Sequence, residues 1–178
     1  MLTDAIILVL LVILDQFTKH LAVIHLKDKP AIPLIKDVFE LNYLENRGAA
    51  FGVLQNQKIF FLVISVIILI AVVFVLFKVP DDKKYSLLHV LLIMVASGGI
   101  GNMIDRIRLE YVVDFFSFVL INFPIFNVAD IYVTVSMFGF AILILFIYKD
   151  EDFSFLALKR KKDSGMVRWY GRVSFCRN

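Results

Sequence analysis

The sequence predicts an all-α membrane protein with four transmembrane helices and an N-in/C-in topology. Of the 178 residues, 60% are apolar, and the mean hydropathy is +0.83. Soluble domains contain about 45–50% apolar residues, so a chain of this size could not bury the excess and keep a wettable surface. The low counts of Gly, Pro and Cys exclude disorder, collagen and a disulfide scaffold. A net charge of +3 does not indicate a nucleic-acid-binding protein.

Four stretches are long and apolar enough to span a bilayer, which requires about 20 residues. They cover residues 2–26, 59–77, 85–104 and 127–148. The first is not a cleaved signal peptide, because it has neither a basic start nor a cleavage site of small residues. Residues 115–129 are a rival span, but they are too short and contain Pro124. We expect an interfacial hairpin or short strands there.

The basic residues predict the orientation. The loops after the first and third spans hold seven Lys and Arg residues, whereas the other side holds eleven. Because cytoplasmic segments carry the excess of Lys and Arg, both termini are expected in the cytoplasm. Residues 1–150 then form the membrane domain, and residues 151–178 form a disordered basic tail. Its run Lys159–Lys162 is expected to bind anionic lipids.

The largest loop between spans has a pattern of residues typical of a strand and a turn. Residues 38–44 are rich in β-formers, and small residues follow from Asn46 to Gly52. This pattern predicts a short strand and a turn at the outer surface.

Polar residues from four separate parts of the chain converge on the same predicted membrane face. They are Asp15, Asn46, Asn102, Arg106, Asp114, Asn127 and Asp130. Ionisable residues within membrane spans are costly and usually functional. Unrelated structural polar residues would be scattered over both faces, so the convergence predicts a site.

Each part of this set also has a structural alternative. Asp15 and Lys19 share a helix face and are either a structural ion pair or substrate contacts. The glycines of the segment 98–101 favour close helix packing. Asn127 and Asp130 suit a helix N-cap and an acid in the first turn.

The residue types restrict the chemistry to carboxylates. Cys176 is the only cysteine, the three histidines lack metal-ligand spacing, and Ser97 has no histidine placed to activate it. We therefore expect no metal or cofactor. The chain between Asp114 and Asp130 is long enough to fold back and bring the two acids together. Such a pair shares one proton, so one acid can activate water while the other polarises a peptide carbonyl.

Five motifs, in this order, resemble the signature blocks of bacterial lipoprotein signal peptidases (signal peptidase II). They are Asp15–Lys19, Asn42–Gly52, Gly98–Arg106, Val112–Phe115 and Phe126–Asp130. The resemblance implies a membrane aspartyl endopeptidase with a small extracytoplasmic β-cradle. It also implies that the chain removes signal peptides from diacylglyceryl-modified prolipoproteins by cleaving before the lipidated cysteine. The protein would lie in the bacterial cytoplasmic membrane, with its active site near the extracytoplasmic face.

The resemblance also assigns roles by position. It implies that Asp114 and Asp130 are the catalytic pair and that Asp105 is structural, holding nearby backbone or Arg106. The implied substrate-binding residues are Asn46, Gly48, Asn102, Arg106, Asn127, Asp15 and Lys19. The expected partners are prolipoprotein substrates and membrane lipids, with no nucleic acid, and the protein is expected to be a monomer.

A carrier or proton-coupled transporter is the second hypothesis, motivated by the intramembrane Asp15 and Lys19. The lack of an internal repeat argues against it, as does the clustering of acids at one face instead of the midplane.

Overall fold

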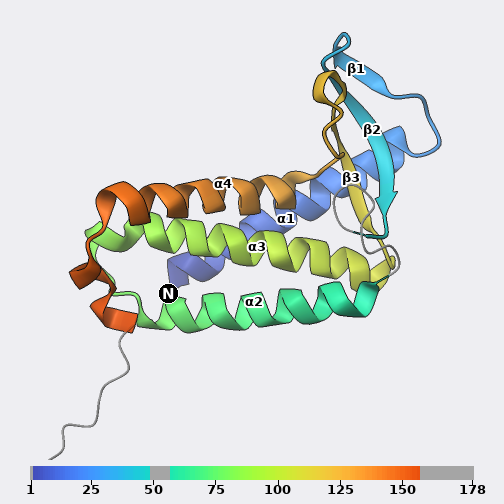
Figure 1. Ribbon diagram of the computed structural model, residues 1–178. Coiled ribbons are helices and arrows are strands. Elements are labelled where there is room, and N and C mark those ends of the chain that lie inside the picture. Colours follow the sequence, from blue (N-terminus) through green and yellow to red (C-terminus); the bar gives the residue numbers. More distant parts are fainter. Residues whose placement is uncertain (1, 49–56, 157–178) are drawn as a thin grey trace, which may run out of the picture.

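A computed structural model describes residues 2–48 and 57–156. In this part of the chain, four long helices form a bundle, and a small sheet stands at one end of it (Figure 1). The helices are α1 (Leu2–Leu26), α2 (Lys58–Lys78), α3 (Ser86–Arg108) and α4 (Val128–Ile142). A short helix, η2 (Lys83–Tyr85), leads into α3, and a π-helical turn, η4 (Leu143–Ile147), extends α4. All four predicted spans are therefore present, each long and apolar enough to cross a membrane.

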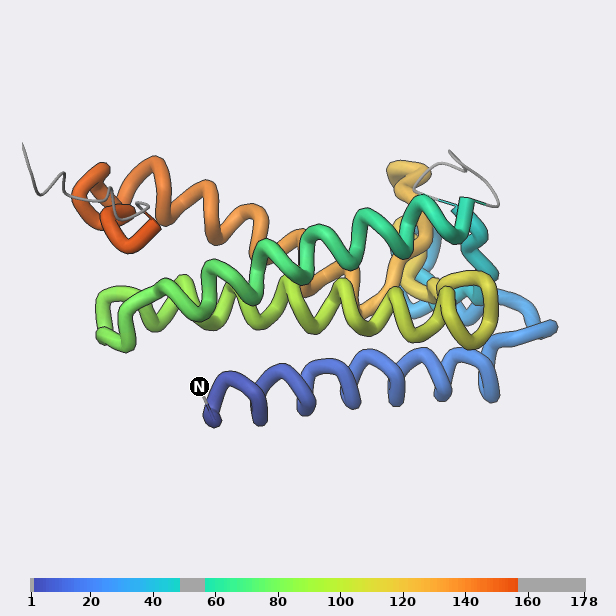
Figure 2. Tube along the Cα trace, turned by 90° about the horizontal axis from the view of Figure 1, so that it is seen from below, coloured from blue at the N-terminus to red at the C-terminus, as the bar shows by residue number. Residues whose placement is uncertain are grey.

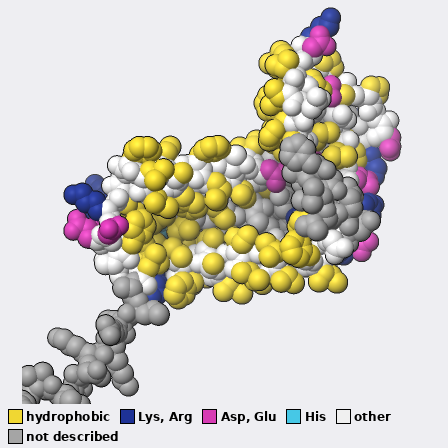
Figure 3. Space-filling view, in the orientation of Figure 1, with side chains coloured by type: hydrophobic (Ala, Val, Ile, Leu, Met, Phe, Trp, Pro, Cys, Tyr) yellow, Lys and Arg dark blue, Asp and Glu magenta, His cyan; other side chains and the backbone are white. Residues whose placement is uncertain are grey.

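Helix α3 forms the centre of the bundle. It lies between α2 and α4 in Figure 1, and Figure 2 shows α1 along its other side. Its buried residues extend from Leu88 to Asp105, whereas Val72 is the one residue of α2 that is buried. Apolar side chains cover the visible face of the bundle, and charged side chains gather at its ends (Figure 3). Such an exposed apolar belt is expected where a protein faces lipid.

Two glycines of α3 allow its neighbours to approach closely. A Cβ atom at Gly98 would lie 2.5 Å from the carbonyl oxygen of Ala129 in α4. At Gly101 it would overlap the carboxylate of Asp15 in α1. Gly99 differs, because its nearest neighbour would be Leu69 at an ordinary 3.7 Å. The predicted role in helix packing is thus confirmed for Gly98 and Gly101, and it brings buried polar groups of α1 and α4 against α3.

The sheet has the antiparallel order β1-β2-β3. Its strands are β1 (Ile32–Ile35), β2 (Phe39–Asn46) and β3 (Val112–Phe118). The strand predicted at 38–44 is confirmed as β2. Strand β1 was not predicted, because it contains Pro33; this proline pairs with Glu40 at the sheet edge, where a missing N–H group is tolerated.

Residues 115–129 do not span the membrane, as predicted. After β3 the chain forms a short helix, η3 (Val119–Ile121), and turns at Asn122, whose φ is 48°. It then returns, so that Phe126 bridges Phe116 through backbone hydrogen bonds of 2.9 and 3.0 Å. This fold carries the chain from β3 directly to the start of α4.

The prediction of a disordered tail is wrong for residues 151–156. A short helix, η5 (Asp150–Leu156), packs against the end of the bundle opposite the sheet. The Tyr85 hydroxyl donates to the Asp152 carbonyl at 2.9 Å, and the Asp152 carboxylate pairs with Lys84. Phe155 packs edge-on against Tyr85. The run Lys159–Lys162, which is expected to bind anionic lipids, lies outside the described residues.

Candidate active site

Strands β2 and β3 place Asp114 at the junction of the sheet and the bundle. Its side chain is buried, with 1% exposed. The Asn46 Nδ2 atom donates to Asp114 Oδ2 at 2.8 Å. The Asn46 Oδ1 atom accepts from the backbone N–H of Gly48 at 2.9 Å, so the NH2 side of this amide faces the carboxylate. The backbone pairing of β2 with β3 thus supplies both the acid and a fixed donor.

The first turn of α4 contributes the second acid. Asn127 Oδ1 accepts from the Asp130 backbone N–H at 3.0 Å, and Asp130 Oδ2 accepts from the Asn127 N–H at 3.1 Å. These reciprocal bonds are a capping box, so the predicted N-cap is confirmed. It does not exclude a second role, because Asn127 Nδ2 also donates to Asp114 Oδ1 at 2.6 Å.

One buried asparagine therefore contacts both acids. Asp114 and Asp130 also line the same cavity, which has a volume of about 480 Å³. Burial raises the pKa of Asp114 to about 7, and the charge of Asp130 acts in the same direction. Hydrogen bonds from Asn46 and Asn127 oppose this rise in the pKa without cancelling it. The arrangement favours one proton on the pair near neutral pH.

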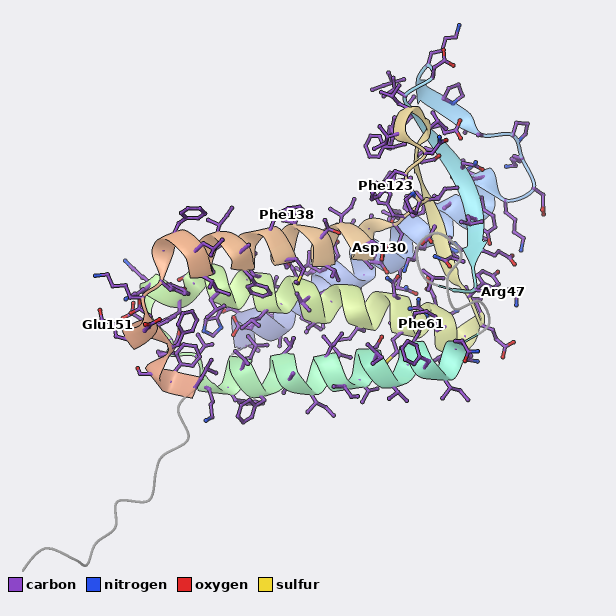
Figure 4. The ribbon with its side chains drawn as sticks, in the orientation of Figure 1. Arg47, Phe61, Phe123, Asp130, Phe138 and Glu151 are labelled. Carbon is purple, nitrogen blue, oxygen red and sulfur yellow. The ribbon has the colours of Figure 1, made fainter. Side chains whose placement is uncertain are left out.

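The rest of the cavity combines apolar walls with one cation. Phe61 from α2 and Phe123 from the loop before α4 lie on opposite sides of Asp130 in Figure 4. The Arg106 guanidinium also lines the cavity, 4.7 Å from the centre of the Phe61 ring. Asn46 and Gly48 complete the sheet side. Such a cavity can hold an apolar chain while presenting two carboxyls and a guanidinium to its polar groups.

Asn102 lies behind the two acids. Its Nδ2 atom donates to Asp130 Oδ1 at 2.8 Å. Its Oδ1 atom accepts from Asn127 Nδ2 at 3.2 Å and from Lys19 Nζ at 2.8 Å. The predicted residues Asn102 and Asn127 thus contact the acids.

Asp15 and Lys19 form the ion pair that their spacing predicted. Lys19 Nζ lies 3.0 Å from the carboxylates of both Asp15 and Asp105, and the Lys19 side chain is 3% exposed. Asp15 accepts from the Ala129 backbone N–H at 2.9 Å, which ties α1 to the start of α4. Among the described residues that line the 480 Å³ cavity, neither Asp15 nor Lys19 occurs.

Asp105 holds nearby backbone, as one of the two predicted alternatives stated. Its Oδ2 atom accepts from the Val113 N–H at 3.2 Å, one residue before Asp114. Gln16 donates to Asp105 Oδ1 at 2.9 Å and to the Gly101 carbonyl at 3.2 Å. Gln16 was not predicted as a site residue. The sequence feature that could have identified it is a polar side chain within an apolar span, next to the candidate acid Asp15.

Phe61 and Phe123 were also missed as cavity residues. The chain has 18 phenylalanines, so an aromatic side chain carries little signal by itself. Among the described residues, no group of three or more His, Cys, Asp or Glu side chains could hold a metal ion.

The comparisons with known proteins agree with this geometry. The profile of a protein family described as "Signal peptidase (SPase) II" matches residues 7–147. The chain belongs to the signal peptidase II family. The matched range includes both acids, most of α1 and all of α2, α3 and α4.

Named relatives support the same membership. A "Lipoprotein signal peptidase" of Streptococcus thermophilus (strain CNRZ 1066) is 48% identical over 139 residues, covering 78% of this chain and 88% of the relative. One of Caldanaerobacter subterraneus subsp. tengcongensis is 46% identical over 142 residues, covering 79% and 94%. Their names describe those proteins as lipoprotein signal peptidases.

Solved structures show the same fold. A bacterial membrane enzyme solved by the in meso method at 2.3 Å resolution has a TM-score of 0.72 and 34% identity, covering 80% of this chain and 87% of that one. A second, at 1.9 Å resolution, has a TM-score of 0.71 and 33% identity, covering 82% and 94%. As a member of the signal peptidase II family with four apolar helices, this chain is a multi-pass membrane protease.

Proposed function

We propose that the chain is a membrane aspartyl endopeptidase that removes signal peptides from diacylglyceryl-modified prolipoproteins, cleaving before the lipidated cysteine. One observation carries the proposal. Asn127 hydrogen-bonds to Asp114 and Asp130, and both acids open into the same apolar-walled cavity. Shared protons between neighbouring carboxyls are the basis of hydrolysis by aspartic proteases.

Burial raises the pKa of Asp114, which favours the protonated form of that acid, and we assign the role of the base to Asp130. Asp130 takes a proton from water as the water oxygen attacks the carbonyl carbon of the scissile peptide bond, and Asp114 gives its proton to the carbonyl oxygen. The C–N bond then breaks as Asp130 passes its proton to the leaving nitrogen and a hydroxyl of the diol returns a proton to Asp114.

The cavity residues would bind the substrate around these acids. Arg106, Asn46 and Gly48 offer polar contacts to the peptide backbone or the lipidated head of the substrate. Phe61 and Phe123 offer apolar contacts to its side chains. Asn102 and Asn127 orient the acids, while Asp15 and Lys19 support them from behind instead of touching substrate.

The excess of basic residues supports an orientation with both termini in the cytoplasm. The sheet and the acids then lie near the extracytoplasmic face, where the sheet serves as the cradle for the substrate. In this arrangement residues 1–150 are the catalytic membrane domain, which works as a monomer without a cofactor.

Substitution of either acid tests the proposal. Asp114→Asn and Asp130→Asn should each lower cleavage of a diacylglyceryl-prolipoprotein by at least about 10³-fold, because the proton transfers are lost. The assay uses purified protein in detergent and follows the product by gel mobility or mass. Asp152→Asn, at the opposite end of the bundle, is the matched control and should cleave normally. Normal cleavage by an Asp114 or Asp130 variant would refute the proposal.

The carrier hypothesis has no such support. It depended on the intramembrane Asp15 and Lys19, but Lys19 forms ion pairs with both Asp15 and Asp105. The family match to signal peptidases favours the peptidase.

A further inference from the structure

Lys19 makes more polar contacts than a structural ion pair requires. A lysine in a membrane span is costly, and one carboxylate would neutralise it. Lys19 instead contacts two carboxylates, of Asp15 and Asp105, and makes a third contact of 2.8 Å with Asn102 Oδ1. The third contact is the one that leads to the catalytic pair.

The contact with Lys19 constrains which way the Asn102 amide faces, in the same sense as the second donor, Asn127 Nδ2 at 3.2 Å. An ammonium group can only donate hydrogen bonds, so it requires the carbonyl oxygen of Asn102 on its side. The NH2 group must then face away from Lys19, and it donates to Asp130 Oδ1 at 2.8 Å. A flipped amide would place NH2 against the ammonium and an oxygen against the Asp130 carboxylate, which is unfavourable at both ends.

This orientation favours the charged form of Asp130. Asp130 accepts one hydrogen bond from Asn102 and another from the Asn127 backbone N–H. Donors to a carboxylate stabilise its ionised form. The two carboxylates that Lys19 contacts partly offset its charge, which still acts on Asp114 and opposes the rise in the pKa of that acid.

We propose that Lys19 is a positioning residue, which acts through Asn102 to keep Asp130 in the ionised, proton-accepting state. The proposal rests on the proposed peptidase function and assigns to Lys19 a part in the chemical step. Lys19 touches neither substrate nor the reacting atoms, so it is not itself a catalytic residue.

Other charged groups also face the pair, and the test must separate their effects. Arg106 from α3 shares the cavity, Asp114 faces Asp130 from β3, and Asp105 and Asp15 lie beside Lys19. Removing Lys19 alone would leave two buried carboxylates without their cation. The test therefore uses Lys19→Met together with Asp15→Asn, which preserves the net charge, and Asp15→Asn alone as its reference.

The first readout is the division of the effect between kcat and KM. The double variant should lower kcat by about 10- to 100-fold relative to Asp15→Asn, with KM changed less than about twofold, because general-base catalysis contributes about 10²–10⁴-fold. The acidic limb of the kcat–pH profile should move to higher pH, because Asp130 loses support for its charged form. Lys84→Met, which breaks the other lysine–aspartate pair, is the control and should keep both constants.

The second readout is a double-mutant cycle with Asn102→Ala. In the Asp15→Asn background, Lys19→Met should lower kcat less than about twofold once Asn102 is already alanine, if Lys19 acts through Asn102. Lys19→Gln, which retains an N–H donor, should recover more of kcat than Lys19→Met does. Neither result is expected of a residue that only stabilises the bundle.

Several outcomes would overturn the inference while leaving the peptidase proposal intact. One is an active wild type in which Lys19 and Asn102 affect kcat independently. The others are a kcat–pH profile that does not shift and equal kcat values for Lys19→Gln and Lys19→Met. Loss of folding in every Lys19 variant, while Asn102→Ala folds with full activity, would also overturn it, because the amide would then be dispensable. An inactive wild type would instead refute the peptidase proposal.

Discussion

The two ends of the bundle each contain a lysine–aspartate pair, and the pairs differ in their access to water. At the sheet end, Lys19 is 3% exposed and its partners Asp15 and Asp105 are equally enclosed. At the opposite end, the Lys84 side chain is 50% exposed while it pairs with Asp152. An exposed pair is screened and worth little, whereas breaking a buried pair leaves an uncompensated charge.

The contacts of each pair indicate its role. The Lys84–Asp152 pair holds η5 to the end of the bundle, together with the Tyr85 and Tyr148 hydroxyls. The Lys19 pair also connects elements, but every connection leads to the candidate site: Asp15 to the start of α4, Asp105 to β3, and Lys19 to Asn102. The same residue types thus attach η5 at one end and order the candidate site at the other.

The largest difference between the two ends is expected from removing one acid of each. Asp105→Ala removes one of the two carboxylates that contact Lys19, one acceptor of Gln16 and the side-chain acceptor of the Val113 N–H. It should destabilise the protein by about 3–5 kcal/mol. Thermal unfolding in detergent, at matched lipid and salt, measures the loss. Asp152→Ala is the counterpart and should shift the transition far less. Equal shifts would show that burial does not distinguish the two pairs.

A smaller effect is expected from filling the space beside the buried pair. Gly101→Ala would press a methyl group against the Asp15 carboxylate, and such overpacking costs about 1–3 kcal/mol. Gly99→Ala, two residues away on the same helix, meets Leu69 at an ordinary distance and is the matched control. Both are compared by thermal unfolding and by cleavage rate. If Gly99→Ala were the more harmful, the close approach of α1 to α3 would not matter for stability.

The pH dependence of activity and of stability should also differ between the two ends of the bundle. Burial raises the pKa of Asp114 to about 7, whereas the hydrogen bond from Lys84 lowers the pKa of Asp152. Because Asp114 must be protonated to act as the acid, kcat should fall about tenfold per unit as the pH rises above about 7. The contribution of Asp152 to stability is present above its ordinary pKa and is lost as the pH falls through its lowered value.

Cleavage and unfolding measured across pH 5–9 test this contrast between the ends. Activity should change in this range, and the attachment of η5 should not. A flat kcat profile up to pH 9 would contradict the acid role of Asp114.

The sequence alone was enough to predict the helices and the meeting of Asp114 and Asp130 at one cavity. Long apolar runs determine spans, because backbone in lipid must satisfy its own hydrogen bonds. Asp114 and Asp130 could be paired because the segment between them is too short to cross the membrane and must return. The spacing of Asp15 and Lys19 likewise predicted their ion pair.

Other contacts could not be predicted because they depend on three-dimensional packing between distant segments. Asp105, the second carboxylate that contacts Lys19, lies in a different helix, and its position in the sequence has no regular spacing from Lys19. Phe61 becomes a cavity wall only because α2 packs on α3 beside Arg106. The helix η5 could not be predicted from residues 151–156 alone, because Phe153 and Phe155 become anchors only by packing against Tyr148 and Tyr85.

The capping box of α4 has a consequence for how such a protein can evolve. Asn127 caps the helix with its Oδ1 atom and donates to Asp114 with its Nδ2 atom. Selection for the start of the helix and selection for the position of Asp114 therefore act on the same amide. Aspartate or serine could start the helix equally well. An ionised aspartate has no donor for Asp114, however, and serine would have to accept from the Asp130 N–H and donate to Asp114 with one oxygen. Asn127 should therefore resist even conservative replacement, and the helix start and the chemistry can change only together.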